Sequence, residues 1–126
     1  AYSNLEPLAQ KGEFTISMST KKASAVDSLK VTRQVVQDYI AQGPTDAQLQ
    51  QAKANIIGGF PMRFDTNAKL LSWLGTIGFY DLPSDYLDTY TQKVQALTTA
   101  QIRDAWQRRI KVEDLNVVTV GGEKKP

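Results

Sequence analysis

The last third of the chain, residues 84–122, constrains the fold most, because it joins two short helices to one apolar strand. Apolar residues recur every three or four positions from Leu87 to Leu97, which is the spacing of a single buried helical stripe. Ser84 is the predicted N-cap of this helix. No side chain in this part suggests chemistry by itself, so its information lies in the order of its elements.

The second helix and the strand follow with almost no linker. Thr98 and Gln101 have the spacing of a capping box, which predicts a helix that starts at once and buries Ile102, Trp106 and Ile110. The valine-rich run that begins at Leu115 closes on two glycines, Gly121-Gly122. It predicts a mostly buried strand.

The N-terminal segment predicts a β-hairpin. Residues 2–8 and 13–20 flank the turn-like sequence Gln10-Lys11-Gly12, and apolar and polar residues alternate from Phe14 to Ser19. The polar face of this hairpin lines a groove or lies in solvent, and the solvated face is the simpler interpretation.

Three further helices are predicted between the hairpin and the last third. The first begins at Ser24 and stops at Gly43-Pro44. The second starts at a capping box of Thr45 and Gln48 and should end at Pro61. Its predicted buried stripe consists of Leu49, Ala52, Ile56 and Phe60.

The third of these helices runs from about Thr66 to Tyr80 and has apolar residues on most of its surface. Leu70, Leu74 and Ile77 share one face, which Leu71 and Trp73 broaden. Gly75 and Gly78 weaken the helix, and close packing against a neighbour would explain why they are there.

Together these elements predict an α+β fold in which a small antiparallel or mixed sheet, the N-terminal hairpin plus the C-terminal strand, has about five helices packed on one face. The 126 residues fit one domain, residues 1–126. The chain starts inside a predicted strand without an initiator methionine, so we expect it to be truncated at its N-terminus and to belong to a longer protein. No apolar run approaches the roughly 20 residues of a membrane-spanning helix.

The sequence contains neither histidine nor cysteine. Disulfides, thiolate or imidazole metal ligands, cysteine nucleophiles and histidine bases are therefore excluded. Only carboxylates remain as metal ligands, and Asp85, Asp88, Asp104 and Asp114 are better explained as residues at helix starts and on exposed faces. We therefore predict no catalytic residue, no metal ligand and no cofactor in this chain, and we assign no substrate-binding residue.

Other candidate residues also have simpler structural interpretations. The basic stretch Arg103–Lys111 suggests nucleic-acid binding, but 15 basic and 13 acidic residues give a net charge of only +2, which favours a solvated helix face. Gly58-Gly59 and Gly121-Gly122 lack the spacing of a phosphate loop. Arg63 is an isolated charge in an apolar bend, for which we expect a structural ion pair. Three aromatic residues are predicted to lie in the core or at its rim: Trp73, Tyr86 and Trp106.

Several local strings resemble one family. Residues 43–53, GPTDAQLQQAK, are similar to the G-x-T-x-x-E-L-x-x-A-K signature of the pitrilysin/insulinase-type zinc metallopeptidases, the inverted zincins, with Gln48 in place of the usual acid. Residues 86–110 resemble that family's Y-x-x-x-I-x-x-V-T-x-x-D-V-x-x-A-A-x-x-x-L pattern. LNVVTVGG at the end resembles its closing strand, and GEFTISMST near the start its strand pair. The order and spacing of these strings cover nearly the whole chain.

The resemblance implies a metallopeptidase-like domain of the pitrilysin and mitochondrial processing peptidase type. The family binds zinc through an H-x-x-E-H motif, and this chain has no histidine, so it resembles a non-catalytic C-terminal domain. Its implied partners are a zinc-bearing N-terminal domain or partner subunit and a peptide substrate, with no nucleic acid. The family's R-x-x-x-G-L-x-Y substrate-holding pattern has no match here, and Tyr2 is not its tyrosine. The resemblance of residues 81–90 to envelope-located bacterial members implies the periplasm.

A second hypothesis is a stand-alone protein-interaction module with no role in proteolysis. A third is nucleic-acid binding through the helix at residues 103–111, which would weaken steeply with salt. The family resemblance favours the first hypothesis, that the chain is a non-catalytic part of a zinc peptidase and forms part of its substrate chamber.

Overall fold

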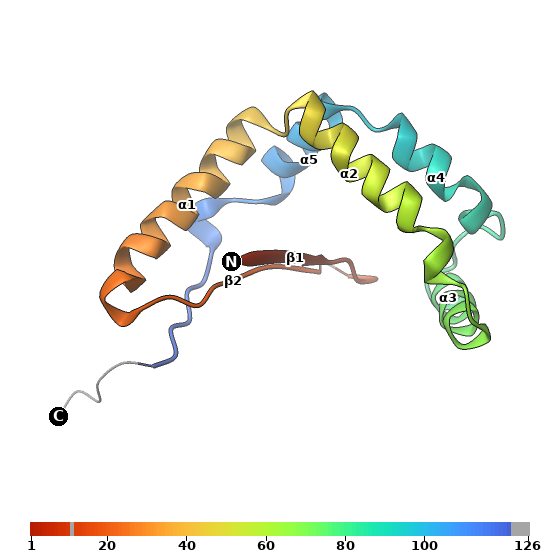
Figure 1. Ribbon diagram of the computed structural model, residues 1–126, viewed down its shortest axis with the longest axis horizontal. Coiled ribbons are helices and arrows are strands. Elements are labelled where there is room, and N and C mark those ends of the chain that lie inside the picture. The colour runs from red at the N-terminus through yellow and green to blue at the C-terminus, as the bar shows by residue number, and fades with distance from the viewer. Residues whose placement is uncertain (11, 122–126) are drawn as a thin grey trace. The chain divides into compact units, whose positions relative to one another are not determined.

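The computed structural model describes residues 1–10 and 12–121 (Figure 1). Its strands and α-helices are β1 (Tyr2–Glu6), β2 (Glu13–Ser17), α1 (Ala25–Gln42), α2 (Asp46–Gly59), α3 (Asn67–Phe79), α4 (Tyr86–Ala96) and α5 (Thr99–Arg109). Short 3-10 turns lie at η1 (Lys22–Ser24), η2 (Pro61–Arg63) and η3 (Val112–Asp114). The α+β class, the hairpin and the five helices predicted from the sequence are confirmed within these residues.

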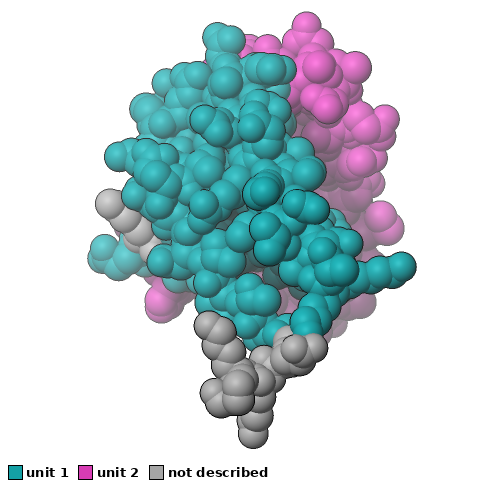
Figure 2. Space-filling view, turned by 90° about the vertical axis from the view of Figure 1, so that its left-hand side faces the viewer, with its two compact units in different colours: residues 1–43, 103–126 teal, residues 44–102 magenta. Residues whose placement is uncertain are grey.

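The chain divides into two compact units, coloured teal and magenta in Figure 2. Unit 1 comprises residues 1–43 and 103–126, and unit 2 comprises residues 44–102. The hairpin, α1 and most of α5 therefore belong to unit 1, whereas α2, α3 and α4 belong to unit 2.

Trp106 joins the hairpin to helix α1 in unit 1. β1 pairs antiparallel with β2 in a register that places Leu5 opposite Phe14, so both side chains lie on one face of the sheet. The Phe14 ring meets the Trp106 ring edge-on at a centroid distance of 5.2 Å, and Trp106 meets Tyr39 of α1 at 4.8 Å. Burial raises the pKa of the Tyr39 hydroxyl. Val36, one helical turn before Tyr39, is the buried apolar residue of α1.

Gly43 ends α1 for two physical reasons. Its φ of 71° lies in the left-handed region that glycine tolerates best, and its N–H donates to the Tyr39 carbonyl at 2.8 Å. A Cβ at this position would also lie 2.8 Å from the Cβ of Arg103 in the same unit. The predicted helix stop is therefore confirmed, and the close approach to Arg103 adds a packing requirement.

The predicted C-terminal strand is not formed. Among the described residues the sheet has two strands, β1 and β2, and the run from Leu115 to Gly121 is unpaired. Val118 is 87% exposed and Val120 is 93% exposed. Strand propensity expresses packing on a sheet rather than an intrinsic backbone preference, so a valine-rich run without a sheet edge stays unpaired. Parts of two predictions lie outside the described residues: Lys11 of the hairpin turn and Gly122 of the closing glycine pair.

Local start and stop signals fix the helices of unit 2. The Thr45 N–H donates to Gln48 Oε1 at 2.8 Å and the Gln48 N–H donates to Thr45 Oγ1 at 3.2 Å, which completes the predicted capping box. The same reciprocal pair forms at residues 98 and 101, before α5. α2 ends two residues before Pro61, as predicted. The N-cap of α4 is Asp85 rather than Ser84.

Lys53, and not Ala52, occupies the buried stripe of α2. Lys53 is 6% exposed, whereas Ala52 is exposed. Its Nζ donates a hydrogen bond of 2.8 Å to the backbone carbonyl of Gln95 in the last turn of α4. The last carbonyls of a helix have no partner within the helix and carry partial negative charge, so an ammonium satisfies them well. This hydrogen bond of Lys53 thus links α2 to the C-terminal end of α4.

Replacing Lys53 by methionine is expected to lower the free energy of unfolding by about 2 kcal/mol, because the side-chain volume stays while the Gln95 carbonyl loses a charged donor. Urea unfolding followed by circular dichroism measures the change. Lys30→Met, at an exposed lysine of α1, removes the same charge and is expected to shift stability by less than about 0.5 kcal/mol. Equal unfolding midpoints for the two variants would contradict the role assigned to Lys53.

Candidate functional site

The carboxylates do not gather into a metal site. Within residues 1–10 and 12–121, no three acidic, histidine or cysteine side chains lie close enough together to hold an ion. Asp104 is instead paired with Arg108, whose Nη2 lies 2.7 Å from Asp104 Oδ2. The hydrogen bond from Arg108 lowers the pKa of the Asp104 carboxyl. Zinc is held in proteins mainly by cysteine, histidine and clustered carboxylates, so these residues do not fit the metal that the family uses.

The ion pair expected for Arg63 is not formed among the described residues. Arg63 lies exposed in η2, and the neighbouring carboxylate of Asp65 binds Lys69 at 2.7 Å. The Lys69 ammonium also donates to the Met62 carbonyl at 2.9 Å. Lys69 is four residues after Asp65, which is a favourable helical spacing for the pair, so the carboxylate nearest to Arg63 in the sequence is already paired.

Five aromatic residues of unit 2 form a continuous row. Phe60 stacks on Tyr90 with centroids 4.5 Å apart and meets Phe64 edge-on at 5.0 Å. Tyr90 lies 5.9 Å from Tyr86, which in turn lies 6.3 Å from Trp73. The structural roles predicted for Trp73 and Tyr86 are therefore confirmed.

The glycine pair of α2 and the basic residues of α5 also have structural explanations. Gly58 and Gly59 form the last residues of α2 rather than a loop, so they make no phosphate cradle. Arg103, Arg108 and Arg109 are exposed, as a solvated helix face requires.

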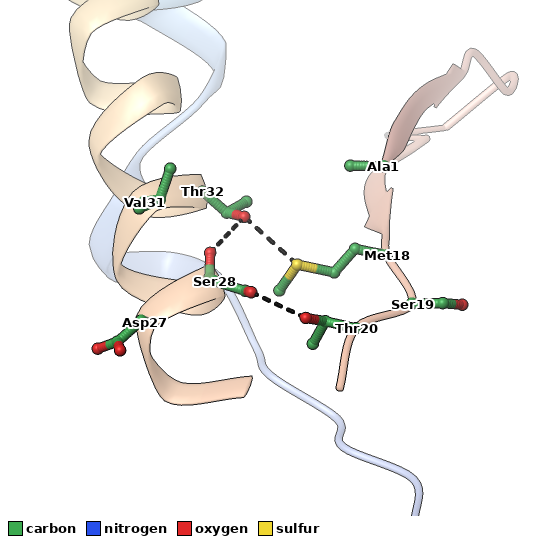
Figure 3. Close-up of a pocket in the computed structure, with 8 residues that line it drawn as sticks. All are labelled: Ala1, Met18, Ser19, Thr20, Asp27, Ser28, Val31 and Thr32. Carbon is green, nitrogen blue, oxygen red and sulfur yellow. Dashed lines mark hydrogen bonds between the residues drawn. The ribbon is translucent and has the colours of Figure 1, made fainter. Parts of the chain in front are cut away.

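A shallow cavity of about 390 Å³ in unit 1 lies between the start of α1 and the end of β2 (Figure 3). Three of its hydroxyl groups contact other lining residues: Ser28 Oγ donates to Thr20 Oγ1 at 3.2 Å, and Thr32 Oγ1 lies 3.5 Å from Met18 Sδ. Asp27 points away from the Met18 side (Figure 3). The cavity therefore offers no nucleophile beside a base and no set of free polar groups that converge on a ligand.

The outer edge of β1 is a strand feature suited to recognition. β1 has β2 as its strand partner in the described sheet, so the backbone groups of its other edge are free to pair with a further extended chain. Tyr2 is 72% exposed and Leu5 is 65% exposed. Leu5 stays exposed although it shares a face with the half-covered Phe14, so the apolar cover over the sheet does not extend to β1.

Helix α3 packs weakly, contrary to the close packing that its glycines suggested. It has no buried residue, and nothing lies within 4 Å of a Cβ built at Gly75 or Gly78. Leu70 and Leu74, which the sequence placed on a common face, are both exposed, whereas Ile77 is half-buried.

Within the part of the chain that the structure describes, no helix is both long and apolar enough to cross a bilayer.

Comparisons with known proteins give a consistent result. No protein-family model matches the chain. The non-peptidase homolog YmxG of Helicobacter pylori (strain ATCC 700392 / 26695) is 24% identical over 108 residues, which are 86% of this chain and 25% of that protein. The crystal structure of the peptidase M16 inactive domain from Pseudomonas fluorescens matches with a TM-score of 0.81 and 32% identity, over 88% of this chain and 26% of that one. The chain thus spans about a quarter of the length of both proteins.

The helices that follow an antiparallel strand pair form an α+β module, and its fold matches the peptidase M16 inactive domain. Its likeness in both sequence and structure is to proteins described as inactive or non-peptidase. The chain is therefore related to the inactive part of the M16 peptidases, the pitrilysin/insulinase type, which confirms the resemblance read from its motifs.

Proposed function

We propose that this chain is the non-catalytic C-terminal portion of a zinc-dependent peptidase of the pitrilysin/insulinase type, or of the inactive partner subunit of such an enzyme. In this role it forms part of the chamber in which peptides are hydrolysed. One observation carries the proposal: 32% identity and a TM-score of 0.81 to an inactive M16 domain over 88% of the chain. The absence of histidine from all 126 residues supports it.

The contribution of the chain is positional. Zinc and the group that activates water come from another domain or from a partner subunit, because this chain has no histidine to supply zinc ligands. The free edge of β1 supplies backbone donors and acceptors that align an extended peptide by strand addition. Holding the peptide in one orientation near the zinc-bearing half lowers the entropic part of the reaction barrier.

The experiment compares the protein encoded by the longer reading frame with a version that lacks residues 1–126. Where the zinc-bearing half is on another subunit, that subunit is added in both cases. We expect removal of residues 1–126 to lower kcat/KM for an extended fluorogenic peptide at least about tenfold, with the zinc content of the catalytic half unchanged. The 126-residue chain alone is expected to hydrolyse nothing. Unchanged peptidase activity without residues 1–126 would overturn the proposal.

The periplasm is the compartment that we propose, on the resemblance of residues 81–90 to envelope-located members of the family. Fractionation of the cells that produce the protein tests it, and recovery of the protein in the cytoplasmic fraction would overturn it.

A stand-alone interaction module is the alternative, and the exposed apolar surface of α3 favours it. The two functions differ in their dependence on the catalytic half. If the chain is a stand-alone interaction module, we expect peptide hydrolysis by the zinc-bearing half to proceed equally well with and without it.

A further inference from the structure

We draw no further inference here: the strongest candidate, the exposed apolar side of α3 at Leu71, Leu74 and Phe79, carries none, because nothing in the structure shows what covers it.

Discussion

Replacing Phe60 by alanine is expected to lower the free energy of unfolding by about 3–5 kcal/mol. Phe60 is 5% exposed and stands at the junction of α2 and η2. Its ring stacks on Tyr90 of α4 at 4.5 Å and meets Phe64 edge-on at 5.0 Å. Removal of the ring therefore leaves a cavity between two helices and breaks two aromatic contacts at once. Urea unfolding followed by circular dichroism measures the loss.

Phe79→Ala is the matched control for this variant. It removes the same ring from a helix of the same unit, but Phe79 is 78% exposed, so we expect a change of less than about 1 kcal/mol. Similar losses for Phe60→Ala and Phe79→Ala would show that Phe60 is not part of the core.

The helix boundaries could be predicted because their signals are local. The capping boxes at Thr45 and Thr98 need only residues three positions away, and both form in the structure. Gly43 and Pro61 end helices through their own backbone geometry. The missing histidines and cysteines were equally informative, since composition alone removes the side chains that zinc chemistry requires.

The features that escaped prediction depend on residues distant in sequence. A strand at residues 115–120 needs a sheet edge, which the run itself cannot supply. Lys53 lies four residues after Leu49, on the same buried stripe, although a lysine is normally exposed because of its charge. Its partner, the Gln95 carbonyl, lies 42 residues later and cannot be found from the local pattern. α3 has apolar residues on most of its surface, so its sequence did not indicate which side would be half-buried.

Trp106 is the second residue whose loss should be severe. Replacing Trp106 by alanine is expected to lower the free energy of unfolding by about 3–5 kcal/mol, because its ring joins Phe14 of β2 to Tyr39 of α1. An isolated two-stranded hairpin is marginally stable in water, and every residue of β1 is exposed. The hairpin therefore depends on the contact between Phe14 and Trp106, and its loss should release both strands.

Hydrogen exchange distinguishes this mechanism from a general loss of stability. In Trp106→Ala the exchange rate of the β2 amides is expected to rise at least about tenfold more than that of the α2 amides, each compared with its own rate in the wild type. The reason is that local opening of the hairpin then precedes global unfolding. Trp106→Phe keeps an aromatic ring between Phe14 and Tyr39, so it should retain about half of the lost stability. If β2 keeps its protection in Trp106→Ala, the hairpin is held by other contacts. The edge of β1 would then keep its position for peptide binding without the contact between Phe14 and Trp106.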